Sequence, residues 1–158
     1  ALEEFLTQFD TLTEKALNKS MAQVIGGGAA GGLGAALHTY LEAKMEKGAA
    51  YFCELTGFGG FLENADLLIT GEGSIDEQSL EGKALVVVAQ LAFDRNIPVI
   101  GLAGGIPLLI SPNLQRYFSM LLAIGNKPEE LEEAISHTKE NLTRTATQIA
   151  NLLCARNS

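Results

Sequence analysis

Three short apolar runs, two of them ending in glycine, follow one another in the second half of this chain. The runs cover residues 66–71, 97–105 and 118–123, and helical periodicity over residues 80–95 separates the first two. Apolar runs of this length that end at turn residues are typical of buried strands, and strands that alternate with helices form parallel sheets. The pattern therefore predicts an α/β fold, a parallel sheet with flanking helices in Rossmann-like layers.

Further helices are predicted outside the sheet. Apolar residues recur at three- and four-residue spacing over residues 2–19, 33–45 and 139–153. Residues 50–64 have the character of short helical turns broken by glycine. The Pro-Glu-Glu sequence at residues 128–130 is expected to start a helix, with both acidic residues in its first turn, where the helix dipole favours anions.

Composition narrows the choice of partners. The 158 residues are 47% hydrophobic, which is enough for a real core, and the net charge is −8. An acidic chain lacks the clustered Lys and Arg that nucleic acid requires, so nucleic acid is excluded as the main partner. No apolar run approaches the roughly 20 residues of a membrane helix, so no membrane partner is expected. A small anionic ligand is still compatible with the charge.

Residues 70–79, TGEGSIDEQS, directly follow the first predicted strand. Ligands of parallel α/β sheets bind beyond the carboxyl ends of the strands, which here means after Thr70, Ala103 and Ala123. Glu72 and Asp76 are expected in one glycine-flanked turn at this edge. They could hold Mg²⁺ with nucleotide phosphates or accept a proton from an attacking hydroxyl. The alternative is that Asp76 or Ser79 caps the following helix while Glu72 is simply solvated.

A second glycine-rich segment, GGGAAGGLG at residues 26–34, precedes a predicted helix. Backbone N–H groups at a helix N-terminus suit a phosphate or carboxylate, and tight packing would also require glycine, so both readings stay open. The segment formally matches G-x-G-x-x-G, which favours a dinucleotide site only after a strand. Neither His38 nor His137 has the partner spacing of a metal site or an activated nucleophile, so a surface or capping role is expected for both.

Taken in order, these motifs resemble the bacterial glycerate kinase family, whose members have two α/β domains around a cleft. The resemblance is carried by the glycine-rich segment, by TGEGSIDEQS with Gly82-Lys83 downstream, and by IPVIGLAG at residues 97–104. It extends from about Ile25 to the end of the chain. The family is considerably longer, so the resemblance implies that residues 1–158 are the C-terminal portion of the enzyme and that the N-terminal portion is a partner of this chain.

The resemblance implies an enzyme of the cytoplasm that transfers the γ-phosphate of ATP to glycerate, usually to its 2-hydroxyl, with Mg²⁺ as cofactor. Asp76 would be the carboxylate that faces the metal or the hydroxyl, and Glu72 its catalytic partner. Lys83 would lie near phosphate or the substrate carboxylate. An apolar face uncovered by the missing portion would favour a homo-oligomer. The implied substrate- or phosphate-binding residues are Gly26, Gly27, Gly28, Gly71, Gly73, Ser74 and Lys83.

Three positions depart from the family pattern. Ser74 stands where the family commonly has Arg, and Leu85 and Val87 replace a Pro and a Gly, which favours a more regular helix after Lys83. Two alternatives to a kinase follow from the sequence. One is a non-catalytic homologue that binds a nucleotide or another anion, and the other is a fragment of an NAD-dependent oxidoreductase with a site in residues 26–31.

Overall fold

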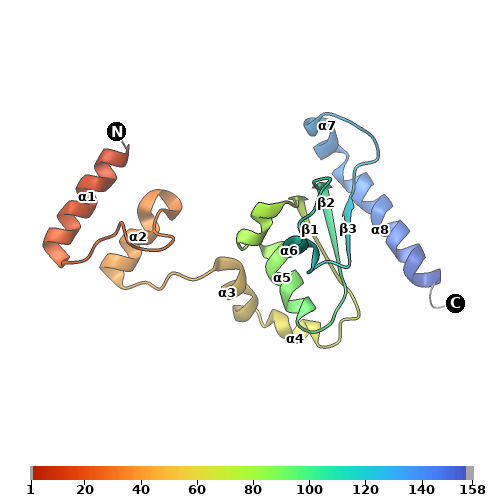
Figure 1. Cartoon of the computed structure of the whole chain (residues 1–158), viewed down its shortest axis with the longest axis horizontal. Coiled ribbons are helices and arrows are strands. Elements are labelled where there is room, and N and C mark those ends of the chain that lie inside the picture. The colour runs from red at the N-terminus through yellow and green to blue at the C-terminus, as the bar shows by residue number, and fades with distance from the viewer. Residues whose placement is uncertain (1, 156–158) are drawn as a thin grey trace. The chain divides into compact units, whose positions relative to one another are not determined.

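The computed structural model describes residues 2–155, apart from the side chains of residues 2 and 81. The chain divides into two compact units, residues 1–47 and residues 48–158. The first unit is helical, and the second contains the sheet (Figure 1). Among the described residues, no helix combines the length and the apolar character that crossing a bilayer requires.

The first unit pairs α1 (Leu2–Leu17) with α2 (Ala29–Leu41). The two helices meet where Thr13 Oγ1 hydrogen-bonds to the Tyr40 hydroxyl at 2.7 Å and the rings of Phe9 and Tyr40 stack at 6.0 Å. Thr13 is fully buried at this contact. The predicted helix of residues 2–19 is therefore present, although much of its apolar face lies at the surface.

The second unit is built on a parallel three-stranded sheet in the order β1-β2-β3. Its strands are β1 (Leu68–Ser74), β2 (Val99–Gly105) and β3 (Met120–Ala123). All three carboxyl ends meet at one edge because both pairings are parallel. The predicted α/β fold with a parallel sheet is confirmed.

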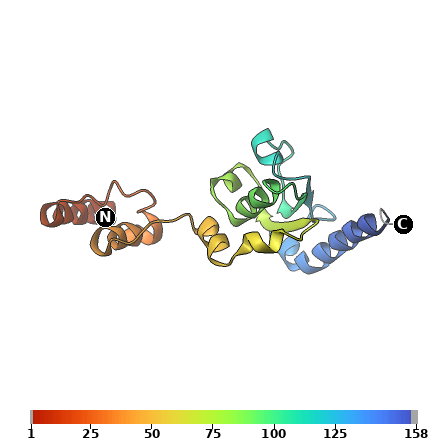
Figure 2. The ribbon, with the colours of Figure 1, turned by 90° about the horizontal axis from the view of Figure 1, so that it is seen from below.

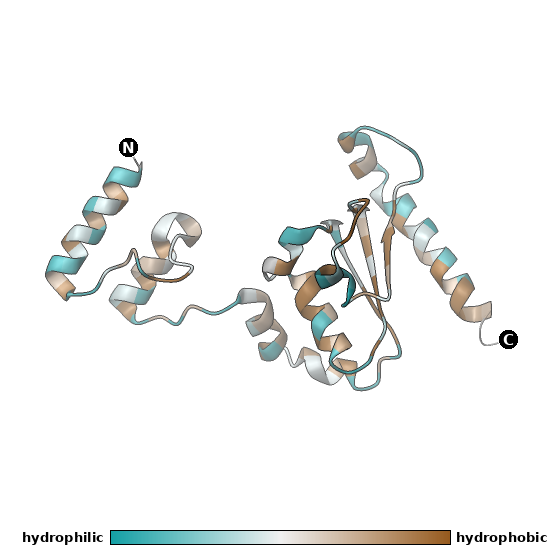
Figure 3. Cartoon of the chain, viewed as in Figure 1, coloured by the Kyte–Doolittle hydropathy of each residue, from teal (hydrophilic) through white to brown (hydrophobic). Residues whose placement is uncertain are grey.

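One face of the sheet carries the larger core. Val99 and Ala103 of β2 pack there with Leu85 and Ala89 of α5 (Ala84–Phe93). Brown ribbon along α5 and the strands in Figure 3 marks this apolar contact. Shorter helices precede and follow α5 in the chain. Those before it are α3 (Gly48–Leu55), α4 (Phe58–Leu62) and η1 (Glu77–Glu81), and the one after β2 is α6 (Pro112–Gln115).

The opposite face of the sheet is covered by α8 (Thr138–Ala155), which follows α7 (Leu131–Ser136) (Figures 1 and 2). Ile149 of α8 packs with Ile100 and Leu102, the residues of β2 that alternate with those facing α5. The guanidinium of Arg144 donates to the backbone oxygen of Ile124, at 2.7 Å, and so fixes α8 to the chain just after β3. The sheet is thus the middle layer of three.

Several predicted boundaries differ from the structure: the helix predicted over residues 33–45 ends at Leu41, and the third strand begins only at Met120. The first strand was expected to end near Thr70 but continues to Ser74, because its last residues pair with β2 as far as Gly105. The predicted helix of residues 80–95 is broken at Gly82, whose φ of +101° is left-handed, and α5 begins only at Ala84. The helix expected from Pro128 starts at Leu131, so Glu129 lies before it rather than in its first turn.

We expect Leu85→Ala to lower the free energy of unfolding by about 2–5 kcal/mol, because the substitution opens a cavity where the side chain is 1% exposed. Urea denaturation of the 158-residue chain measures the change. Leu108→Ala is the matched control, since that leucine is 99% exposed and its loss should change stability by no more than about 0.5 kcal/mol. Equal effects of the two substitutions would contradict this assignment of the core.

Candidate functional site

A groove of about 1030 Å³ lies along the carboxyl ends of β1 and β2. Residues 71–74 of β1 and residues 103–105 of β2 form one wall, and Ile124 contributes from just after β3. Leu131 and Ile135 of α7 lie on the other side, together with residues at the start of α8. The edge that the sequence predicts for a ligand therefore coincides with a groove in the second unit.

Four predicted site residues, Gly71, Glu72, Gly73 and Ser74, line this groove from β1. They belong to a strand rather than to the expected turn, and all four are exposed. A Cβ at Gly71 would lie 3.0 Å from the backbone oxygen of Leu102, so glycine at this position lets the two strands approach. The strand thus presents the Glu72 carboxylate at the groove on a rigid backbone.

Asp76 and Lys83 come together just beyond the strand. The Lys83 Nζ lies 3.7 Å from Asp76 Oδ1, and the side chains of Lys83 and Asp76 are 40% and 41% exposed respectively. An exposed pair of this kind stabilises the fold by only about 0–1 kcal/mol, so stability alone does not require it. Both groups are open to solvent and could contact a bound anion or cation.

Asp76 also has the structural role that sequence analysis gave as the alternative. It is the N-cap of η1, and its backbone N–H donates to Ser79 Oγ at 3.2 Å, while the Ser79 hydroxyl donates to Asp76 Oδ1 at 3.4 Å. Ser79 and the neighbouring Ile75 are fully buried, which anchors the turn to the core. The cap fixes the position of the carboxylate without removing it from solvent.

The second glycine-rich segment lies in the first unit, apart from β1 in the division of the chain. Gly27 serves packing: its N–H donates to the backbone oxygen of Val24, and an added Cβ would lie 2.8 Å from that oxygen. Gly26 has a φ of +76°, which favours glycine. The residues before the segment form turns and bends, so the strand that a dinucleotide motif requires is absent from residues 18–28.

A parallel sheet with glycine-rich strand ends, beyond which Asp76 and Lys83 pair, places the chain in the α/β class of proteins, whose ligands bind at the carboxyl edge of the sheet. The chain belongs to the Glycerate kinase family, whose model matches residues 1–154.

Relatives and a solved structure agree with this assignment. The chain is 39% identical to a glycerate kinase of Bacillus subtilis strain 168 over 94% of its own length, and 34% identical to a glycerate 2-kinase of Escherichia coli K12 over 96%. A crystal structure titled "putative glycerate kinase 2 from Salmonella typhimurium LT2" superposes with a TM-score of 0.70 at 33% identity, over 96% of this chain and 38% of that one. The chain spans 39% and 40% of the two curated relatives.

Sequence analysis missed one cluster of polar residues. Glu129, Glu133 and His137 come together around α7. The sequence had indicated no metal-ligand spacing around either histidine. Glu133 and His137 are four residues apart, which can place two side chains on one face of a helix, but Glu129 lies before α7 and helical spacing does not predict its approach. His38 is exposed, and its Nδ1 hydrogen-bonds to the backbone oxygen of Ala43 at 2.8 Å, in accord with a capping role.

If the glycines of residues 26–34 serve tight packing and not anion binding, an added methyl group should destabilise the fold only where its Cβ meets other atoms. We expect Gly27→Ala to lower the free energy of unfolding by about 1–3 kcal/mol, because the new Cβ would overlap neighbouring atoms. Gly28→Ala is the matched control: no atom lies within 4 Å of its Cβ position, and its φ of −69° suits alanine. Thermal unfolding compares the two, and equal stability of both variants would contradict a packing role for Gly27.

Proposed function

We propose that this chain is part of a cytoplasmic ATP-dependent glycerate kinase that phosphorylates the 2-hydroxyl of glycerate. The observation that carries the proposal is the exposed pair of Asp76 and Lys83, which stands at the carboxyl edge of the sheet in a member of the glycerate kinase family. The name of the Escherichia coli relative, a glycerate 2-kinase, supports the choice of hydroxyl.

The roles of the side chains follow from their chemistry. The Asp76 carboxylate would accept the proton of the attacking hydroxyl or help to hold a metal ion, with Glu72 as the second carboxylate. Lys83 would neutralise negative charge on the phosphate or on the substrate carboxylate. Gly71, Gly73 and Ser74 would let bound substrate approach the backbone of β1.

The donor set suits Mg²⁺, which takes carboxylate oxygens together with substrate phosphates. Glu72 is exposed, and Asp76 is 41% exposed, so both can reach a hydrated ion. The ion would neutralise charge that builds up during phosphoryl transfer. The chain's own residues position the two carboxylates: the pairing of β1 with β2 holds Glu72, and the cap of η1 holds Asp76.

We propose that residues 1–158 are the C-terminal portion of a longer enzyme and that the remaining portion completes the active site. The curated relatives are about two and a half times as long as the matched region, since it covers 39% of their length. The wide groove also supports this, because its apolar residues Ile69, Leu131 and Ile135 are 48%, 73% and 63% exposed. An exposed apolar surface of this kind is suited to being covered by another part of a protein.

A non-catalytic, anion-binding homologue is the second candidate. The observation that favours it is Ser74 at the groove, because the position is commonly Arg in the family and the hydroxyl cannot replace a guanidinium charge. ATP consumption separates the two candidates. A kinase requires glycerate-dependent turnover, whereas the non-catalytic homologue binds ATP or glycerate without turnover.

We expect Asp76→Asn to lower kcat/KM for glycerate by about 100- to 10,000-fold in the full-length gene product, because asparagine cannot accept the proton or supply a charged metal ligand. Asparagine is as good an N-cap as aspartate, so the fold should be preserved. A coupled ATP-consumption assay with D-glycerate and Mg²⁺ gives the rates, and thermal unfolding checks the cap.

Two further substitutions make the result specific. Glu77→Gln removes the adjacent exposed carboxylate and should leave the rate within about twofold of wild type, as expected for a surface change. Ser79→Ala removes the buried hydroxyl that contacts Asp76. It should lower the free energy of unfolding by about 1–3 kcal/mol and should lower kcat/KM much less than Asp76→Asn does. Full activity of Asp76→Asn would reduce Asp76 to a helix cap.

We expect the isolated 158-residue chain to have no robust glycerate kinase activity. The reason is that catalysis of phosphoryl transfer depends on positioning by groups from the whole cleft, and this chain corresponds to 39% of its relatives. The same assay compares the isolated chain with the full-length gene product at equal molar concentration. Comparable turnover of the two proteins would refute the proposed division of the active site.

A further inference from the structure

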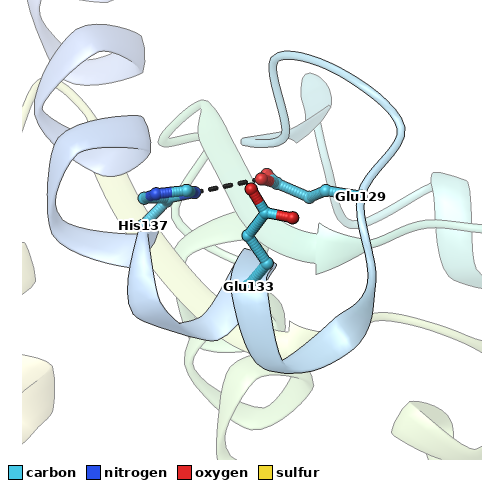
Figure 4. Close-up of side chains that lie close together, drawn as sticks. All are labelled: Glu129, Glu133 and His137. Atoms are coloured by element: carbon cyan, nitrogen blue, oxygen red, sulfur yellow. Dashed lines mark hydrogen bonds and ion pairs between the residues drawn. The ribbon is translucent and has the colours of Figure 1, made fainter.

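Three ionisable side chains gather around α7, away from Asp76 and Lys83 in the sequence. Glu129 precedes the helix, Glu133 lies within it and His137 is its C-cap. One ligand atom from each lies within 4.8 Å of the others, and His137 Nδ1 is 3.0 Å from Glu129 Oε2. Figure 4 shows the Glu133 carboxylate directed toward the same point as the carboxylate of Glu129 and the ring of His137.

The buried carboxylate is the unusual member of this cluster. The Glu129 side chain is only 3% exposed, and among the described residues its Oε1 has no hydrogen-bond partner. Leaving a buried charged oxygen without a partner costs more than leaving a neutral one, about 1–3 kcal/mol or above. A bound cation would satisfy this oxygen.

The carboxylates of the cluster are paired with an exposed lysine that a metal ion could replace. Lys127 Nζ is 3.2 Å from Glu133 Oε1 and 3.6 Å from Glu129 Oε2, and among the described ion pairs Lys127 is the lysine that contacts these carboxylates. The Lys127 side chain is 54% exposed, so it can move out into solvent when another cation takes its place.

We propose that Glu129, Glu133 and His137 bind a divalent metal ion of the Zn²⁺ class. Imidazole nitrogen together with carboxylate oxygen is a ligand set for Zn²⁺ and related transition metals, whereas Mg²⁺ and Ca²⁺ prefer oxygen alone. Tetrahedral Zn²⁺ places its ligand atoms about 3.3 Å apart, so the 4.8 Å cluster needs shifts of side chains only. Water would occupy the fourth position.

The site would have a structural effect on the groove. Glu129 comes just before α7 and His137 ends it, so one ion would tie both ends of this six-residue helix. Leu131, Ala134 and Ile135 of the same helix line the groove. Metal binding would therefore fix the wall of the groove that faces β1. The inference does not depend on kinase activity, since it concerns this chain's own residues and their affinity for metal.

The test is metal binding by the purified 158-residue chain after treatment with a chelator. The chain carries Cys154→Ser throughout, because that exposed thiol could also bind Zn²⁺. Competition with a chromophoric chelator measures Zn²⁺ affinity and stoichiometry, and Co²⁺ absorption reports the coordination. We expect one Zn²⁺ per chain, an affinity for Mg²⁺ that is far weaker, and a rise in the unfolding temperature when Zn²⁺ is added.

Glu133→Gln and His137→Gln should each weaken Zn²⁺ binding by at least about 10- to 100-fold, which is the loss that even supporting residues cause. Glu132→Gln and His38→Gln are matched controls on exposed residues outside the cluster, and they should bind as the parent chain does. Lys127→Met keeps all three ligands and removes the competing cation, so it should bind Zn²⁺ more tightly.

Three results would overturn the proposal. The first is the absence of stoichiometric Zn²⁺ binding to a folded chain. The second is binding that Glu133→Gln and His137→Gln leave unchanged. The third is weaker or unchanged binding by Lys127→Met, which tests the site even if the ligand variants fail to fold. Each would show that the cluster is a network of ion pairs among Lys127, Glu129, Glu133 and His137 and not a metal site.

Discussion

The close pairing of two glycine-rich strand ends is the constraint on which the rest of the second unit depends. A Cβ at Gly104 would lie 2.9 Å from the backbone oxygen of Gly73, and one at Gly71 would lie 3.0 Å from that of Leu102. Side chains at these positions would force β1 and β2 apart near their carboxyl ends. The ladder instead continues to the pair of Ser74 and Gly105, which carries β1 beyond the core to the groove.

The position of the candidate site follows from this extension. Because β1 continues to Ser74, Glu72 is held on a strand, and the chain turns only afterwards at the buried Ile75. Asp76 then caps η1, and the left-handed Gly82 ends that short helix so that Lys83 returns to the Asp76 carboxylate. Capping and site formation are compatible here, because the hydroxyl of Ser79 contacts the carboxylate from the buried side while the rest of the group faces solvent.

The groove depends on a second, weaker element. Its far wall is α7, a helix of six residues with no buried side chain among them, so the packing of α7 alone contributes little. The contacts that hold the segment before α7 are polar: Glu129 with His137 and Lys127, and Lys127 with Glu133. The ionic contacts around α7 therefore bear on the shape of the groove, and a metal ion that replaced Lys127 at this cluster would join the two ends of α7.

The sequence by itself determined the fold class and the edge of the sheet at which ligands are expected, because apolar runs, helical periodicity and glycine are local signals of secondary structure. It also contained the segment TGEGSIDEQS, which carried the resemblance to the glycerate kinase family. Only the tertiary structure decided that residues 71–74 are a strand, since that depends on pairing with a segment about 30 residues away in sequence. The burial of Glu129 beside His137 likewise arises from the approach of a loop to the end of a helix, and no local pattern specifies such a contact.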